Sequence, residues 1–182
     1  MILFFCGLSG AGKTTLAESV KARFLEDGIY PEIIDADEYR ARMFTDLKFS
    51  KEDRFENIRR LGSLAGKFAA HGIITIVSAI NPYEEIRAEL IKNLPDVKIV
   101  HIDCPLEQLK KRDTKGLYAR AELPDGSPGQ LKNLTGVNDP FEVPALPDIY
   151  VNTQHSTLTA CTDHIYTYIL NQLRNANQKQ TA

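Results

Sequence analysis

The chain has 182 residues, of which 43% are hydrophobic and 25% are charged, and its formal net charge is −2. This length suits a single domain, expected over residues 1–175 with a polar tail at 176–182. A balance this close to neutral argues against general nucleic-acid binding, and no apolar run reaches the roughly 20 residues of a membrane span. The three cysteines have no metal-ligand spacing, which favours buried thiols and a reduced, cytoplasmic compartment.

Apolar runs typical of strands alternate with helical patterns along the chain. Strands are expected near residues 2–6, 32–35, 73–78, 97–103 and 148–151. The third is an almost continuous apolar run, as expected for a strand buried on both faces. The alternation predicts an α/β fold with three layers, in which helices flank a parallel five-stranded sheet and ligands bind at the carboxyl ends of the strands.

A glycine-rich segment follows the first expected strand. Residues 7–14 read Gly-Leu-Ser-Gly-Ala-Gly-Lys-Thr and match the phosphate-loop pattern G-x-x-x-x-G-K-[ST], and an amphipathic helix is expected from Thr15 to about Asp27. Backbone N–H groups of such a loop and helix start surround phosphates, the lysine supplies charge, and the threonine hydroxyl can ligate Mg²⁺. Nucleotide contacts are expected from Gly7, Ser9, Gly10, Ala11, Gly12, Lys13, Thr14 and Thr15.

Two carboxylates end the second expected strand. Asp35 and Asp37 are two positions apart, so on a strand end both side chains point the same way, toward the cleft. Either can contact Mg²⁺ or accept the proton of a hydroxyl, and their roles cannot be separated from the sequence. The alternative is a solvated turn with helix-capping aspartates. Asp103 superficially resembles a Walker B aspartate, but the following Cys104-Pro105 favours a turn residue.

The segment Ser50-Lys51-Glu52-Asp53 resembles a capping box and is expected to start a long helix. Its apolar stripe, extended backward by one turn, reaches Arg54 and Asn57. Polar side chains that face a core need a partner, and an anionic ligand would provide one, so both are expected in the cleft. The alternative is a partly exposed helix end with a surface arginine.

Residues 113–143 are rich in charged residues, glycine and proline and show little periodicity. So long an irregular stretch suggests a mobile lid, whose Lys115, Arg120 and Lys132 could close over phosphates; the alternative is a solvated loop. The final helix is expected to end in a frayed polar tail from Arg174.

With these motifs in place, the chain resembles the adenylylsulfate kinases, phosphate-loop kinases that phosphorylate the 3′-hydroxyl of adenosine 5′-phosphosulfate with MgATP. The resemblance covers nearly all of residues 2–152. Beyond the phosphate loop, it rests on Asp35-Ala36-Asp37 with Arg40, Phe49-Ser50, Asp53-Arg54 with 56–60, Pro82-Tyr83, 112–118 and 135–142.

The resemblance implies a P-loop kinase fold with a lid, a sulfate-assimilation transferase, ATP and Mg²⁺ as cofactors, nucleotides as partners and a homodimer. It implies catalytic roles for Lys13, Asp35 and Asp37, Mg²⁺ contacts from Thr14 and Asp35, and Arg112 on the ATP side. Acceptor contacts are implied for Asp37, Arg40, Phe49, Arg54, Asn57, Ile80, Asn81, Lys115, Leu117 and Leu134.

Several positions depart from the family pattern. Ala36 replaces a glycine, and residues around 124–129 lengthen the lid. Asn81 replaces a serine and Glu84 an arginine in the family's Ser-Pro-Tyr-Arg segment. Leu134 replaces an aromatic residue that helps to sandwich the adenine, a loss of stacking worth about 1 kcal/mol.

Glu84 and Leu134, which differ from the family pattern, are compatible with a second hypothesis. The protein would then be a kinase of the same family that acts on another nucleotide-linked acceptor, such as cytidine diphosphoramidate. A kinase of an unrelated small metabolite is a further possibility. A non-catalytic nucleotide-binding module is a third class, against which the intact Lys13, Thr14, Asp35 and Asp37 argue.

Overall fold

The computed structural model describes residues 1–180. Helices and strands alternate through most of the chain, as the hydrophobic pattern predicts. In order they are β1 (Ile2–Cys6), α1 (Lys13–Glu26), β2 (Glu32–Asp35), α2 (Ala36–Arg42), α3 (Lys51–Ala70), β3 (Thr75–Ser78), α4 (Glu84–Asn93), β4 (Val97–Asp103), α5 (Leu106–Arg112), α6 (Leu117–Ala121), β5 (Ile149–Asn152) and α7 (Leu158–Gln180).

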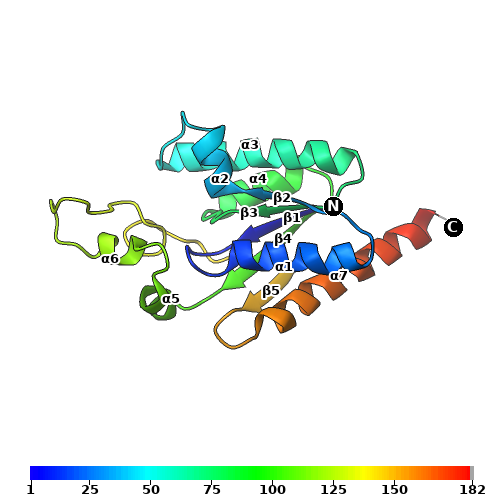
Figure 1. The fold of residues 1–182 in the computed structure, drawn as a ribbon. Helices are drawn as coiled ribbons and strands as arrows, with labels where there is room; N and C mark the ends of the chain where they lie inside the picture. Colours follow the sequence, from blue (N-terminus) through cyan, green and yellow to red (C-terminus); the bar gives the residue numbers. More distant parts are fainter. Residues whose placement is uncertain (181–182) are drawn as a thin grey trace.

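The five strands form one parallel sheet in the order β2-β3-β1-β4-β5. Helices α3 and α4 cover one face and α1 and α7 cover the other, which gives the three expected layers (Figure 1). Strand β1 lies at the centre, and its side chains alternate between the two cores: Leu3 and Phe5 pack with α1 and α7, whereas Phe4 packs with α3 and α4. Full burial on both faces explains why β1 is apolar throughout.

All five expected strands are confirmed, with shifts of one or two residues at three ends. The third begins at Thr75 instead of residue 73 because the Ile73 N–H closes the end of α3 by donating to the Phe68 carbonyl, 3.1 Å away. The fifth covers Ile149–Asn152. All three cysteines are buried free thiols, as expected.

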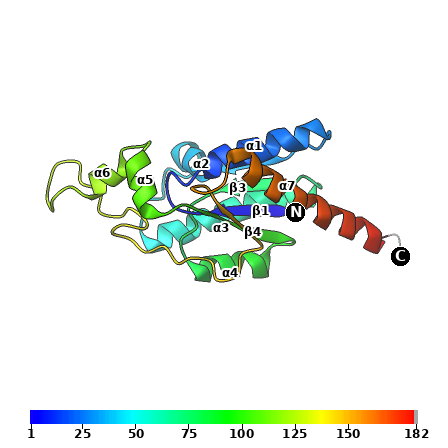
Figure 2. The ribbon, with the colours of Figure 1, turned by 90° about the horizontal axis from the view of Figure 1, so that it is seen from below.

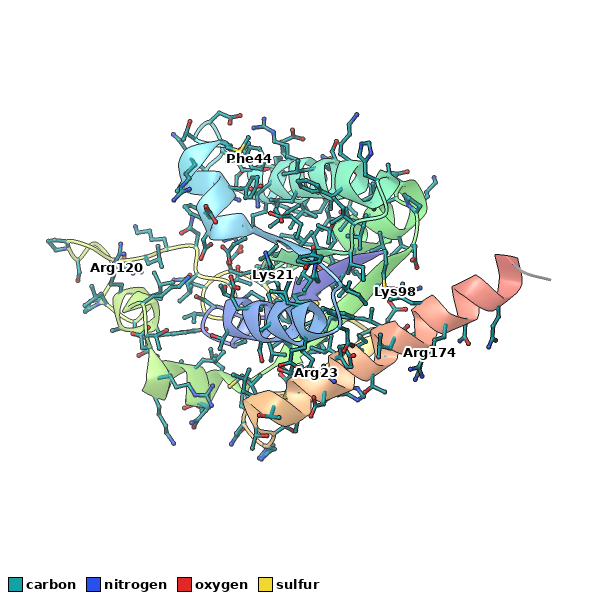
Figure 3. All side chains as sticks on the ribbon, turned by 45° about the vertical axis from the view of Figure 1, so that its right-hand side comes forward. Lys21, Arg23, Phe44, Lys98, Arg120 and Arg174 are labelled. Carbon is teal, nitrogen blue, oxygen red and sulfur yellow. The ribbon has the colours of Figure 1, made fainter. Side chains whose placement is uncertain are left out.

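Helices α1 and α7 pack side by side below the sheet (Figures 1 and 3). Helix α1 begins at Lys13, two residues earlier than expected, and buries Leu16, Val20 and Phe24. The guanidinium of Arg23 lies 4.2 Å from the centre of the Tyr166 ring of α7.

Helix α7 continues to Gln180, so the polar residues from Arg174 are helical where a frayed tail was expected. Alanine, arginine, lysine and glutamine are good helix formers, which explains the extension. The last two residues of the expected tail, 181 and 182, lie outside the described residues. Among residues 1–180, no helix is both long enough and apolar enough to cross a membrane.

The carboxyl ends of the strands point toward α5, α6 and the long irregular segment that follows them (Figures 1 and 2). Within the lid segment (residues 113–143), α6 is the one helix, and most other residues form turns and irregular backbone. The segment therefore lies at the edge of the sheet where ligands of parallel α/β folds bind. Its motion as a lid stays a prediction.

Candidate active site

A cavity of about 650 Å³ opens at the carboxyl ends of the strands. Its wall combines the phosphate loop, the start of α2, the end of β3 and the lid segment. The sequence-predicted residues that line it are Ser9, Gly10, Gly12, Lys13, Thr14, Thr15, Asp35, Asp37, Phe49, Arg54, Ile80, Lys115, Leu117 and Leu134, and Arg120 joins them.

Seven other candidates do not line this cavity. Arg112 lines a smaller recess beside it, together with Ser9 and Gly10. The others are Gly7, Ala11, Arg40, Asn57, Asn81 and the exposed Lys132.

The phosphate loop (residues 7–14) turns on glycines. Gly10 and Gly12 have φ angles of 76° and 96°, in the left-handed region that side chains disfavour. Gly12 is the N-cap of α1 and has no side chain to accept the first N–H groups of the helix. These N–H groups lie at the cavity and are therefore available to bind an anion.

Lys13 is folded back onto the phosphate loop. Its Nζ donates to the carbonyl oxygens of Gly7 and Leu8 at 2.9 and 2.8 Å. Desolvation by the surrounding protein lowers the pKa of this ammonium to about 8. A bound phosphate would favour the charged form and give the ammonium a stronger partner than these carbonyls.

Gly7 is required for a steric reason, because a Cβ added there would lie 2.2 Å from the Ile102 carbonyl oxygen of β4. We expect Gly7→Ala to lower the free energy of unfolding by about 3 kcal/mol or more, since backbone must move to relieve the overlap. Gly66→Ala, inside α3, is the matched control: its Cβ meets only a flexible Leu94 side chain at 3.2 Å. Urea unfolding of both variants checks this. Equal stability of the two would contradict it.

Asp35 joins the start of α2 to the phosphate loop. Its Oδ1 accepts the N–H groups of Asp37 and Glu38 at 2.9 and 3.4 Å, and its Oδ2 accepts the Thr14 hydroxyl at 2.8 Å. The helix-capping alternative is therefore correct for Asp35, and the same carboxylate also faces the cavity. Asp37 lies in the first turn of α2, and like Asp35 it lines the cavity.

Ser78 is a site residue that the sequence analysis missed. It ends β3, lines the cavity, and its Oγ lies 3.4 Å from that of Thr14. The signal was available, since a hydroxyl at the carboxyl end of an apolar central strand faces the ligand edge. Thr14, Asp35 and Ser78 together present hard oxygen atoms, the donor type that Mg²⁺ prefers, so these residues fit the ion that the sequence predicts.

Asp37 contacts the lid segment. The Lys115 ammonium lies 2.6 Å from its Oδ2, and both side chains are more than half exposed, at 53% and 75%. Tyr118 anchors the same segment, because its hydroxyl donates to the Ser9 carbonyl at 2.7 Å. Burial raises the pKa of Tyr118 to about 12, so this hydroxyl keeps its proton. Tyr118 was not among the site residues predicted from the sequence.

Arg54 is buried at 8% exposure and finds its partners within the protein. Its guanidinium donates to the Phe49 carbonyl, the Thr135 hydroxyl and the Asn133 carbonyl at 3.1, 2.9 and 2.7 Å, and it lies 3.2 Å from the Asp139 carboxylate. The partner expected from the sequence was an anionic ligand, whereas in the structure residues of the chain itself pair this cation. Arg54 nevertheless lines the cavity, so it can contact a ligand while it organises residues 133–139.

Phe49 presents a half-exposed ring to the cavity. The guanidinium groups of Arg40 and Arg54 lie 5.0 and 5.8 Å from its centre. Arg40 therefore reaches the cavity through Phe49. Leu134, 5% exposed, lines the same cavity.

Asn57 and Asn81 lie behind the wall, at 4% and 1% exposure. The Asn57 Oδ1 and both side-chain polar atoms of Asn81 have no hydrogen-bond partner among residues 1–180. Asp103 lies outside the cavity and is the last residue of β4, where a turn residue was expected. Its carboxylate accepts hydrogen bonds from Tyr150 and Asn152 and so links β4 to β5.

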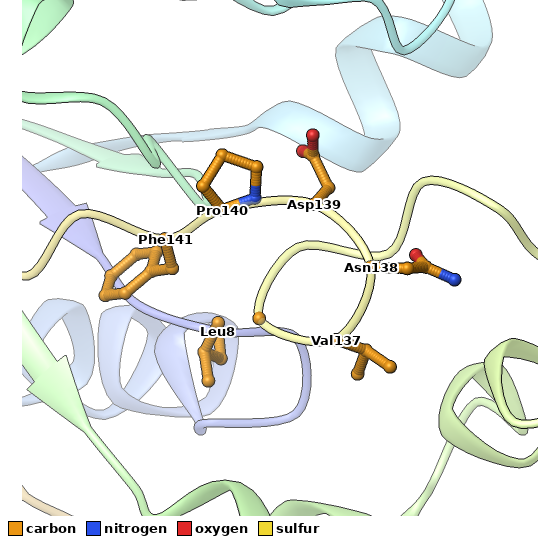
Figure 4. A pocket seen from close by; sticks show the side chains of 7 residues that line it. Leu8, Val137, Asn138, Asp139, Pro140 and Phe141 are labelled. Carbon is orange, nitrogen blue, oxygen red and sulfur yellow. The ribbon is translucent and has the colours of Figure 1, made fainter.

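A second, more open hollow of about 610 Å³ lies between Leu8 of the phosphate loop and residues 136–141 (Figure 4). Gly136 has a φ of 88°, and a Cβ there would lie 2.6 Å from the Leu8 side chain. The side chains of Asn138 and Asp139 point away from Leu8 (Figure 4). The lid segment therefore packs closely on the phosphate loop at Gly136, and the hollow lies beside this contact.

Comparison with known proteins agrees with this arrangement. Residues 1–152 match the family model described as adenylylsulphate kinase. Adenylyl-sulfate kinases of Chloroflexus aurantiacus and Clostridium acetobutylicum are 43% and 42% identical to the chain, over 91% and 92% of its length and 86% and 82% of theirs.

Solved structures agree as well. The APS kinase of Mycobacterium tuberculosis, in complex with AMPPNP and APS, superposes with a TM-score of 0.85 at 34% identity, covering 92% of this chain and 96% of that one. Shikimate kinase from Aquifex aeolicus, at 17% identity and a TM-score of 0.51, supports the fold alone. The phosphate loop, the carboxylates beside it and these similarities agree: the chain belongs to the adenylylsulphate kinase family.

Proposed function

We propose that this protein transfers the γ-phosphoryl group of ATP to the 3′-hydroxyl of adenosine 5′-phosphosulfate, giving 3′-phosphoadenosine 5′-phosphosulfate for sulfate assimilation. One observation carries the proposal: a single cavity joins an intact phosphate loop, the carboxylates of Asp35 and Asp37, and a wall that contains Phe49 and Arg54. A donor phosphate and an acceptor nucleotide can therefore meet beside a carboxylate.

On the ATP side, the N–H groups at the start of α1 and the Lys13 ammonium bind the phosphates and stabilise the charge that develops during transfer. Thr14 and Asp35, with Ser78 beside them, would hold Mg²⁺. The ion would neutralise charge on the β- and γ-phosphates. Arg112, in the recess beside Ser9, would face the nucleotide.

On the acceptor side, we assign the two carboxylates different roles. Both oxygens of Asp35 already accept hydrogen bonds, from Thr14 and from backbone N–H groups. The Asp37 carboxylate contacts only the exposed ammonium of Lys115 among the interactions described, so it is freer to orient the 3′-hydroxyl and take its proton. The hydroxyl oxygen then bonds to the γ-phosphorus as the bond to the β-phosphate oxygen breaks, and ADP leaves.

The acceptor would lie against Phe49 and Leu134, with Ile80 and Leu117 completing the apolar contacts and Arg54 close to its anionic group. Arg40 would help to position the Phe49 ring. Asn57 and Asn81 are buried outside the cavity and would support its wall. Closure of the lid segment would exclude water and limit ATP hydrolysis.

The alternative acceptor rests mainly on Leu134. Glu84 gives little support to a different acceptor, because its carboxylate accepts two hydrogen bonds from Arg87. Leu134, by contrast, lines the cavity where an acceptor base would lie.

If adenine binds there, Leu134→Phe is expected to lower the KM for adenosine 5′-phosphosulfate about fivefold, the equivalent of one restored aromatic contact. Steady-state kinetics at saturating ATP checks this. Leu131→Phe, the same enlargement elsewhere on the cavity wall, is the control and should leave this KM unchanged. A fall in the KM for a cytidine-linked acceptor alone would contradict the assignment of adenine.

The deciding experiment measures ADP release from MgATP with adenosine 5′-phosphosulfate and then with cytidine-linked analogues, and identifies each product by mass. A 3′-phosphorylated adenosine product at the higher kcat/KM supports the proposal. Turnover with a cytidine-linked acceptor alone would instead support a kinase of another nucleotide-linked acceptor. The absence of turnover with any acceptor would favour a non-catalytic nucleotide-binding module.

The resemblance also implies a homodimer, and the three free thiols favour the reduced cytoplasm; we propose both. Light scattering on the purified chain tests the dimer, for which a single monomeric mass would be contrary evidence.

A further inference from the structure

Arg87 of α4 is a charged side chain that the proposed mechanism does not use, although it is almost fully buried, at 1% exposure. A buried guanidinium is costly unless its donors are paired. Its Nε and Nη2 donate to one carboxylate oxygen of Glu84 at 2.9 and 2.7 Å. Nη1 donates to the Asn81 carbonyl, and Nη2 also donates to the Glu142 carbonyl, both at 2.7 Å.

The first carbonyl belongs to a strained residue. Asn81 has a φ of 47°, in the left-handed region, and it precedes Pro82, a position that favours extended backbone. Such a conformation persists only where the surroundings hold it. Ala79 and Ile80, immediately before it, line the cavity, and the Ile80 carbonyl accepts the Gly7 N–H of the phosphate loop. The hydrogen bond from Arg87 to Asn81 therefore stabilises the backbone of residues 79–81, of which Ala79 and Ile80 form part of the cavity wall.

The second carbonyl belongs to the lid segment. The Glu142 N–H donates to the Pro82 carbonyl at 2.8 Å, and the Glu142 carboxylate accepts the Glu84 N–H, at the start of α4, at 2.6 Å. Residues 79–84 and the end of the lid segment are therefore joined by two direct hydrogen bonds, and Arg87 bonds to both segments beside them. We call Asn81, Glu84, Arg87 and Glu142 the arginine latch.

Earlier in the chain, the lid segment also forms part of the cavity wall. Arg54 holds it by Asn133 and Thr135, and Thr135 and Leu134 line the cavity. The latch therefore fixes one end of a short stretch whose other end forms the proposed acceptor site. None of its four members lines the cavity.

We propose that Arg87 is a positioning residue for the acceptor nucleotide, and that Glu84 is the counter-ion of this buried arginine. The proposal rests on the proposed function for the identity of the acceptor. It also gives the Glu84 departure a physical role: its carboxylate, 55% exposed, turns toward Arg87 and pairs with it locally. The phosphate loop and α1 make no direct hydrogen bond with Arg87, and the Gly7–Ile80 hydrogen bond is an indirect link, so ATP binding is expected to change much less than acceptor binding when the latch is broken.

The test separates acceptor binding from ATP binding. Arg87→Met keeps an unbranched side chain but removes all its donors, and is expected to raise the acceptor KM about tenfold or more, with the ATP KM within about twofold of the wild type. Arg87→Lys keeps the charge without the forked geometry and should recover part of this loss. Glu84→Gln, at a half-exposed position, should raise the acceptor KM about threefold because a neutral acceptor of hydrogen bonds remains.

Glu89→Gln is the matched control, since Glu89 lies on the same helix and pairs with exposed Arg59 at 2.6 Å. It should leave both KM values unchanged. Thermal unfolding is measured in parallel, and Glu84→Gln keeps the test valid if Arg87→Met does not fold. Equal changes in the two KM values, or no change in either for Glu84→Gln and Arg87→Lys, would overturn the proposal.

Failure of the proposed function is distinguishable. It appears in the wild type, as an absence of turnover with adenosine 5′-phosphosulfate, before any variant is compared. If the wild type phosphorylates another nucleotide-linked acceptor, the same comparison is made with that acceptor, and the split in KM still decides the role of Arg87. If the wild type phosphorylates none of the acceptors tested, both the proposed function and the proposed role of Arg87 are overturned.

Discussion

Lys13→Ala is expected to lower the rate of phosphoryl transfer about 10³-fold or more while the protein stays folded. Phosphoryl transfer depends on positioning and on stabilisation of charge, and loss of one preorganised donor of this kind typically costs a factor of 10²–10³. Lys13 is a cation aimed at the donor phosphates, so its loss lies at or beyond the upper end of that range. In the free protein it makes two hydrogen bonds, both to loop carbonyls, and alanine suits the first turn of α1.

The matched control is Lys21→Ala, two turns further along the same helix and outside the cavity (Figure 3). ADP release and thermal unfolding are measured for both variants. We expect Lys21→Ala to keep wild-type turnover and both variants to unfold within a few degrees of the wild type. Wild-type turnover in Lys13→Ala would show that the phosphate loop is not the donor site.

Asp35→Asn is expected to lower kcat about 10²-fold or more, with the fold retained. Asparagine caps helices as well as aspartate does, so the N–H groups of Asp37 and Glu38 keep an acceptor. The substitution therefore removes chiefly the negative charge beside Thr14. If Asp35 holds Mg²⁺, raising the Mg²⁺ concentration should restore part of the lost rate.

Asp37→Asn is expected to lower kcat by a similar factor through loss of the proton acceptor, and added Mg²⁺ should not restore it. This contrast separates two carboxylates whose roles the sequence leaves open. Glu38→Gln, which breaks only the exposed 2.9 Å ion pair with Arg42 on the same helix, is the control and should keep full activity. Rescue of Asp37→Asn, and not of Asp35→Asn, by Mg²⁺ would reverse the assignment.

Local patterns in the sequence were sufficient for the fold. Five apolar runs predicted the five strands to within two residues, because central parallel strands must be apolar on both faces. The phosphate loop was recognisable because its glycines and lysine act through their own backbone and charge. The cap at Ser50 was also predicted, and its hydroxyl accepts the Asp53 N–H at 3.1 Å.

Contacts between distant segments were not accessible in this way. The sequence analysis placed Arg54 in the cleft correctly but assigned its partner to a ligand, whereas Thr135 and Asn133, some eighty positions away, supply the acceptors. Tyr118 was missed because it gains its role only when α6 meets the phosphate loop. Glu84 was interpreted as a charge reversal near the substrate because its partner Arg87 carried no sequence signal of burial.

The sequence by itself determined the α/β architecture, the phosphate loop and the presence of carboxylates at the ligand edge, since these depend on periodicity and on residues within a few positions of one another. Only the tertiary structure decided which carboxylate caps α2 beside Thr14, which lysine crosses to Asp37, and how Arg54 and Arg87 hold the lid segment. The reason is physical: a buried cation is satisfied by whichever carbonyls and carboxylates the folded chain brings within reach, and no local pattern encodes that choice.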